Sequence, residues 1–194
     1  MSASRTASYP REVPGAGEPI SLRLMGPDDR EAVLTFAQEL PAHDLLFLPR
    51  DISQPKVLDA WVREIERGAM TTVLAVSEGI VIGCATIVTE PLSWSPHVAE
   101  LRIVVLPSAR GRGLGRFLAQ DAFALAIPLG IEKFTVQMTA DQVGAISVFE
   151  TMGYHAEALL RDHVRDRDGI KHDIVVLSHD VAKVDARLSA YGLT

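Results

Sequence analysis

The sequence lacks several features that define whole classes of protein. Its 194 residues include one cysteine, Cys84, so it forms neither an internal disulfide nor a cysteine-based zinc site. No apolar run reaches the roughly 18 residues that a membrane-spanning helix needs, and the first 18 residues lack the apolar segment of a secretory signal. We therefore expect a cytoplasmic protein that does not contact membranes, with Cys84 buried as a small hydrophobe.

Basic residues are also too few for a general nucleic-acid binder, since 19 Lys and Arg stand against 25 Asp and Glu and the net charge is −6. One stretch differs from this balance. Residues 101–120 contain Arg102, Arg110, Arg112 and Arg116, and all 25 acidic residues lie outside it. In an acidic chain, a stretch that carries only positive charge is expected to bind an anion.

The pattern of apolar residues predicts one α/β domain over residues 19–180, and the hydrophobic fraction of 47% is enough for its core. Alternating apolar residues predict strands at residues 20–24, 71–77, 80–89, 97–106, 134–138, 154–160 and 171–178, with a turn at Glu78-Gly79. Amphipathic spacing predicts helices at residues 27–40, 53–65 and 116–127, and a fourth helix with Asp141 as N-cap and Ala145, Phe149 and Met152 on its buried face. We expect a central, mixed, twisted sheet of about seven strands, flanked by about four helices.

The two ends of the chain differ from this domain in composition. Residues 1–18 are rich in Ser, Pro and Gly, which predicts a flexible N-terminal extension. Residues 181–194 form a C-terminal extension, which we expect to be a packing helix or a homodimer contact.

A glycine-rich turn joins the strand at 97–106 to the helix at 116–127. In the segment 110–115, Gly111, Gly113 and Gly115 allow a tight turn and close approach of a ligand. The helix that follows offers unpaired N–H groups and the positive end of its dipole, which suit a pyrophosphate. A nucleoside-triphosphate loop or a dinucleotide fold is disfavoured, because the loop does not end in Gly-Lys-Ser/Thr and the third glycine arrives one residue early. A nucleotide-binding module of another kind stays an alternative.

The sequence Arg110-x-x-Gly113-x-Gly115 resembles the Gln/Arg-x-x-Gly-x-Gly/Ala motif of the GNAT superfamily of N-acetyltransferases. The order of the predicted elements agrees with that family over residues 20–178, including Val105-Leu106-Pro107 before the motif. The resemblance implies a sheet that splays between its fourth and fifth strands, with acyl-CoA in the resulting V. It also implies an enzyme, an N-acyltransferase that moves an acetyl (acyl) group directly from acetyl-CoA (coenzyme A) to a primary amine.

The resemblance also assigns roles to particular residues. The backbone N–H of Val105 would meet the thioester carbonyl and stabilise the developing oxyanion. Glu100 is the best candidate for the base that deprotonates the amine, and His97 is a weaker one. The cofactor-binding residues implied are Val105, Arg110, Gly111, Arg112, Gly113, Leu114, Gly115, Arg116, Gln142 and Phe149. The acceptor, a small molecule or a peptide amine, should also touch residues 42–52.

Two positions depart from the family pattern. Gln142 stands where many members carry Asn, and Phe149 stands where many carry the Tyr that protonates the leaving thiolate. Phe149 cannot donate a proton, so a catalytically weak acyl-CoA-binding or sensing module is the alternative function.

The charged segment 161–173 predicts either a solvated hairpin or a wall that recognises the acceptor. We expect no metal site, because the spacing of His163, His172 and the neighbouring aspartates matches no dedicated site.

Overall fold

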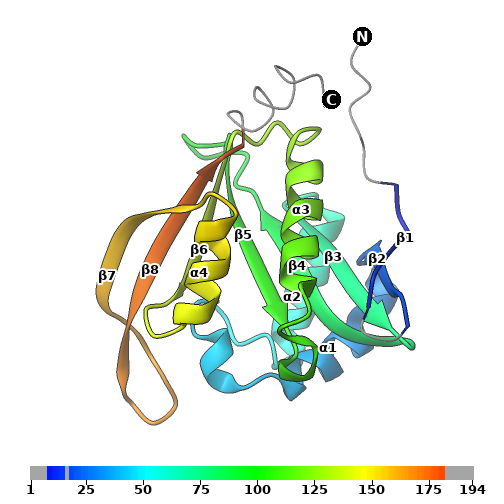
Figure 1. The fold of residues 1–194 in the computed structure, drawn as a ribbon, viewed down its shortest axis with the longest axis horizontal. Helices are drawn as coiled ribbons and strands as arrows, with labels where there is room; N and C mark the ends of the chain where they lie inside the picture. The colour runs from blue at the N-terminus through cyan, green and yellow to red at the C-terminus, as the bar shows by residue number, and fades with distance from the viewer. Residues whose placement is uncertain (1–7, 16–17, 182–194) are drawn as a thin grey trace.

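Eight strands form the single sheet that positions the rest of the protein, of which the computed structural model describes residues 8–15 and 18–181. The strands are β1 (Arg11–Val13), β2 (Ile20–Leu24), β3 (Met70–Ser77), β4 (Ile80–Val88), β5 (Val98–Val105), β6 (Lys133–Thr139), β7 (His155–Arg165) and β8 (Lys171–Asp180). They lie in the order β1-β2-β3-β4-β5-β6-β8-β7 (Figure 1). The predicted mixed α/β sheet is confirmed, with one strand more than the seven expected.

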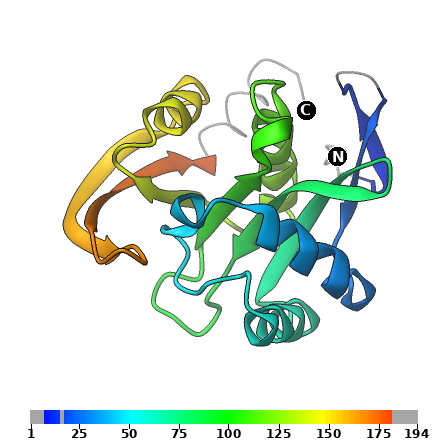
Figure 2. The ribbon, with the colours of Figure 1, turned by 90° about the horizontal axis from the view of Figure 1, so that it is seen from below.

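Helices cover both faces of this sheet. They are α1 (Arg30–Glu39), α2 (Pro55–Glu66), α3 (Leu114–Ala126) and α4 (Val143–Thr151), with short 3-10 turns η1 (Pro27–Asp29), η2 (Ala42–Leu45) and η3 (Pro107–Ala109). Figure 2 shows α1 and α2 on one face of the sheet, and α3 and α4 on the other. In the described part of the chain, no helix is long and apolar enough to cross a membrane.

The predicted hairpin of β3 and β4 is confirmed, and α3 packs on its second strand. Glu78 and Gly79 both have positive φ, of 50° and 79°, as a two-residue hairpin turn of the primed type requires. A β-carbon on Gly83 of β4 would lie 3.4 Å from the side chains of both Leu114 and Leu118. Helix α3 therefore packs directly on the strand at this point, which fixes its first turn close to the end of β5.

The same strand holds the single cysteine in the setting that the sequence predicts. Cys84 is 1% exposed, and burial raises the pKa of its thiol to about 12. The thiol therefore stays protonated at neutral pH and behaves as a small apolar side chain.

Strands β5 and β6 pair in parallel over a short length and then separate. Their register holds from Val98↔Lys133 to Glu100↔Thr135. Beyond this point, β5 continues on β4 as far as Val105, and β6 continues on β8 as far as Thr139. The predicted splay between the fourth and fifth expected strands is confirmed, and it opens toward the first turn of α3 (Figure 1).

The prediction of a flexible extension over residues 1–18 is wrong for Arg11–Val13, which form the edge strand β1 on β2. The reason lies far along the chain, in the carboxylate of Asp121 on α3, which is 2% exposed. This carboxylate accepts hydrogen bonds from Tyr9 Oη at 3.0 Å and from Arg11 Nε at 3.1 Å, and it also pairs with Arg11 Nη2. A buried charge without such partners is costly, so these bonds hold the N-terminal segment in place.

Two helix starts also differ from the sequence prediction. Helix α3 begins at Leu114 rather than at residue 116, because Gly113 acts as its N-cap. The N-cap of α4 is Gln142 instead of Asp141, and Ala145 is exposed, so the buried face of α4 is Phe149 and the half-buried Met152. Residues 182–194 of the expected C-terminal extension lie outside the described part of the chain.

The pair between Arg11 and Asp121 leads to a prediction on stability. Replacing Arg11→Met leaves a buried carboxylate without its cation, and we expect the free energy of unfolding to fall by about 3 kcal/mol. Tyr9→Phe removes one neutral donor and should cost about 1 kcal/mol. Urea unfolding measures both, with Glu12→Gln on the exposed side of the same strand as control. A loss no greater for Arg11→Met than for Glu12→Gln would contradict the account.

Burial of His179 gives the protein a pH dependence. His179 on β8 is 8% exposed, its ring lies 4.9 Å from Phe123 and 5.0 Å from Tyr154, and burial lowers the pKa of the imidazole. The unfolded chain therefore binds this proton more readily, so stability is lost as pH falls through the ordinary histidine value of about 6.5. We expect His179→Phe to flatten the fall in unfolding free energy between about pH 7 and 5. The exposed His163→Gln should keep the wild-type slope, and an unchanged slope in His179→Phe would exclude this origin.

Candidate functional site

The glycine turn presents backbone N–H groups at the open end of the splay. Gly111 and Gly113 have left-handed φ values of 73° and 79°, which glycine adopts without strain, and Gly113 is the N-cap of α3. The first N–H groups of α3, those of Leu114 and Gly115, have no acceptor within the helix. A β-carbon at Gly113 or Gly115 would meet no atom within 4 Å, so there is room for a ligand against this backbone.

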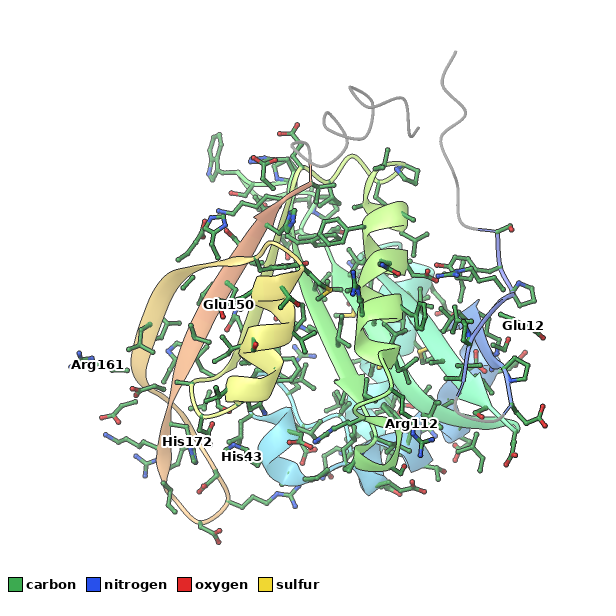
Figure 3. All side chains as sticks on the ribbon, in the orientation of Figure 1. Glu12, His43, Arg112, Glu150, Arg161 and His172 are labelled. Carbon is green, nitrogen blue, oxygen red and sulfur yellow. The ribbon has the colours of Figure 1, made fainter. Side chains whose placement is uncertain are left out.

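Among the described residues, the side chain of one of the three arginines around this turn has hydrogen-bond partners, and the side chains of the other two have none. Arg112 and Arg116 are exposed, and Figure 3 shows Arg112 beside the first turn of α3. Arg110 instead donates from Nε and Nη2 to the Val105 carbonyl, at 3.1 and 3.0 Å, and from Nη2 to Asp44 at 2.5 Å. Its guanidinium therefore braces the turn against β5 and η2.

The backbone of Val105 is turned toward the gap between β5 and β6. The next N–H, that of Leu106, donates to the Ile82 carbonyl on β4 at 3.0 Å. Because the peptide groups of a strand alternate in direction, the N–H and carbonyl of Val105 point away from β4. The carbonyl accepts hydrogen bonds from Arg110, while the N–H faces the side on which β6 has separated.

The carboxylate of Glu100 is committed to a neighbour. Arg102 donates to both of its oxygens, from Nε at 2.9 Å and from Nη2 at 2.8 Å. The two side chains are only 21% and 15% exposed. The register of β4 and β5 has no bulge from Glu100 to Val105, so Glu100 and Arg102 lie on the sheet face that α1 and α2 cover. The guanidinium of Arg102 is thus engaged by this carboxylate. The weaker candidate base, His97, lies at the closed end of the splay, where its carbonyl accepts hydrogen bonds from the start of β6.

A cavity of about 490 Å³ lies under α2 on the same face of the sheet. It runs along β4 and β5, and its walls are mainly apolar. Its lining includes Trp61, Met70, Cys84, Val88, Arg102 and Val104. The cavity therefore adjoins β5 one residue before Val105, on the face opposite α3.

The short segment η2 contacts residues beside both diverging strands. Asp44 pairs with Arg110 on the β5 side, as described above. On the β6 side, His43 Nε2 lies 3.0 Å from Asp141 Oδ2 and 3.4 Å from Thr139 Oγ1. Adjacent residues of η2 thus contact both arms of the V.

Two histidines and two aspartates meet beside Thr139, the last residue of β6. The rings of His43 and His172 are in edge contact, with centroids 5.1 Å apart, and His172 Nε2 lies 2.8 Å from Asp166 Oδ2. Figure 3 shows His43 and His172 close together at this end of the molecule. The sequence prediction missed this cluster, because its members come from three segments about 25 to 130 residues apart and no local motif joins them.

The two positions that depart from the family pattern have clear places. Gln142 is the N-cap of α4, and its carbonyl accepts the N–H groups of Ala145 and Ile146. Phe149 is 9% exposed and packs on Tyr154, with ring centroids 5.0 Å apart. The Tyr154 hydroxyl is buried with no hydrogen-bond partner among the described residues, and burial raises the pKa of that phenol.

Known proteins resemble this chain in sequence and in fold. The model of the acetyltransferase (GNAT) family matches residues 37–154, which include the glycine turn and both diverging strands. A Bacillus subtilis (strain 168) protein, YwnH, named "Putative phosphinothricin acetyltransferase", is 29% identical over 84 residues. That match covers 43% of this chain and 51% of YwnH, so this chain spans about half the length of that relative.

Three solved structures show the same fold. An N-acetyltransferase from Staphylococcus aureus Mu50 superposes with a TM-score of 0.74 at 17% identity, over 84% of this chain and 99% of its own. For the GNAT domain of S. lividans PAT the TM-score is 0.71 at 20% identity, over 88% and 96%. For yncA from Salmonella typhimurium, solved with its cofactor acetyl-CoA, it is 0.72 at 16% identity, over 84% and 95%. Since the family model covers more than half of the sequence, the chain belongs to the GNAT family of acetyltransferases.

Proposed function

We propose that this protein transfers an acetyl group from acetyl-CoA to a primary amine, with both substrates bound in the splay between β5 and β6. The observation that carries the proposal is the end of pairing at Glu100↔Thr135, which leaves the N–H of Val105 facing the gap beside the glycine turn. One strand end and one helix start thus offer donors to two parts of the same ligand.

The pyrophosphate of acetyl-CoA would bind the backbone of residues 110–115. The open space in front of Gly113 and Gly115 and the unpaired N–H groups of α3 fit this anion. Arg112 and Arg116 would add positive charge from the exposed side, with planar donors suited to phosphate. Arg110 contributes its backbone, because its side chain holds the turn in place.

Val105 would donate its N–H to the thioester carbonyl of acetyl-CoA. When bound, acetyl-CoA would supply the activated acetyl group. A donor fixed by the neighbouring strand needs no reorganisation, and such a donor lowers the barrier by roughly 3 kcal/mol. Holding the amine against the thioester in one cleft supplies the entropic part of the rate enhancement. Gln142 and Phe149 on α4 would contact the cofactor from the other arm of the splay.

The acceptor amine would enter from the face of α1 and α2. There η2 closes the wide end of the splay, and the cavity under α2 has room for an apolar part of the acceptor. Glu100 as the base stays a prediction, and the bidentate pair with Arg102 engages both of its oxygens.

The proposal predicts how the glycine turn controls cofactor binding. Gly113→Glu places a carboxylate where the pyrophosphate would lie, and we expect the Kd for coenzyme A to rise by more than about tenfold. Gly113→Ala is the matched control, since it carries the same backbone strain at positive φ without the charge. Titration calorimetry measures both, with urea unfolding to show that each variant is folded. A wild type that does not bind coenzyme A, or two variants that bind equally well, would contradict the proposal.

A second assay distinguishes an enzyme from a sensing module. The sensing module is the alternative because position 149 is Phe, where many family members carry Tyr. Acetyl-CoA is incubated with a panel of primary amines, and release of the free thiol is followed. We expect turnover with at least one amine. Tight binding with no thiol release for any acceptor would favour the sensing module.

A further inference from the structure

We propose that His43 accepts the proton that the acceptor amine loses, and that Asp141 orients the imidazole for this task. The inference rests on the acetyl transfer proposed above and adds the identity of the proton acceptor.

The position of His43 is the first argument. Its neighbour Asp44 is held by Arg110, which in turn donates to the carbonyl of Val105. His43 itself contacts Asp141 and Thr139, at the end of β6. The imidazole therefore lies between the ends of the two diverging strands, at the wide end of the gap that the N–H of Val105 faces. An amine that attacks a carbonyl held by this N–H comes from the same gap.

The hydrogen bonds of the cluster fix which nitrogen is free. A hydrogen bond from Thr139 lowers the pKa of Asp141, and the nearby His43 and His172 lower it further, so this carboxylate is ionised and only accepts. The Nε2 atom of His43 must then carry the hydrogen that points to Asp141, which leaves the lone pair on Nδ1. The same argument applies to His172, since its hydrogen bond lowers the pKa of Asp166.

Charged and titratable groups face His43 from three parts of the fold. Asp141 faces it from the loop before α4, His172 with Asp166 behind it faces it from β8 and its hairpin, and Asp44 next to it is neutralised by Arg110. Asp141 would stabilise the imidazolium once formed, and His172 offers a second imidazole in edge contact with the first.

The proton balance also accounts for Phe149. As the amine nitrogen bonds to the acetyl carbon, one N–H bond of the amine breaks and its proton goes to Nδ1 of His43. The C–S bond breaks with its electron pair on sulfur, and the imidazolium returns the proton to the thiolate, directly or through water. The cycle therefore needs no tyrosine at position 149.

Glu100 lacks this arrangement. Both of its oxygens accept from Arg102, whereas the Nδ1 atom of His43 has no hydrogen-bond partner among the described residues. A proton acceptor needs a free lone pair, which favours the imidazole.

The test compares kcat/KM against pH for the wild type and for His43→Gln, with the best amine of the panel. We expect His43→Gln to lower kcat/KM by about 10²- to 10⁴-fold and to lose the decline toward acid pH, while the Kd for coenzyme A changes less than about twofold. In His43→Ala, added imidazole should restore part of the rate. The exposed His155→Gln, at the start of β7, is the control and should match the wild type.

Asp141→Asn tests the orienting role. The amide presents its own N–H to Nε2 and favours the tautomer with hydrogen on Nδ1, so kcat should fall at least about tenfold while KM changes little. A wild-type rate and pH profile in His43→Gln would overturn this inference alone. Activity that chelation removes and Zn²⁺ restores would also overturn it, in favour of a metal. No turnover by the wild type with any amine would overturn the proposed function, and this inference with it.

Discussion

The site depends on one feature of the sheet: β5 and β6 stop pairing after Glu100 and Thr135. Each strand keeps its outer partner, so the gap after Glu100 and Thr135 opens without loosening the rest of the sheet. The gap frees the N–H of Val105, and the chain leaves β5 at the same point to form the glycine turn and α3. Donors for two distant parts of the proposed acetyl-CoA ligand thus follow from a single loss of pairing.

The gap is held open by charged side chains as well as by the sheet. Arg110 connects the carbonyl of Val105 to Asp44, and His43, the residue before Asp44 in η2, contacts Asp141. These contacts join the two arms through η2, which lies on the face where the acceptor would enter. The arginines of the acid-free stretch 101–120 therefore differ in their contacts. Arg102 binds Glu100 and Arg110 contacts η2, whereas Arg112 and Arg116 are exposed and are the two that we propose for the pyrophosphate.

The elements that the sequence predicts well are those whose causes are local. The Glu78-Gly79 turn, the glycine segment 110–115 and the apolar strands all carry their signals within a few residues. Strand β1 escaped prediction because its anchor, Asp121, lies 110 residues from Arg11. Asp141 has the side chain of a good N-cap, yet its carboxylate instead pairs with His43, a contact that only the assembled sheet creates. The histidine cluster was hidden for the same reason.

The central claim is that one ligand spans the N–H of Val105 and the first turn of α3. A titration of ¹⁵N-labelled protein with acetyl-CoA, followed by amide NMR, tests this most directly. The account predicts that the amide signals of Val105, Gly113 and Gly115 shift the most, and in proportion to one another. Shifts confined to residues of the cavity under α2, with Val105 and the glycine turn unchanged, would contradict it.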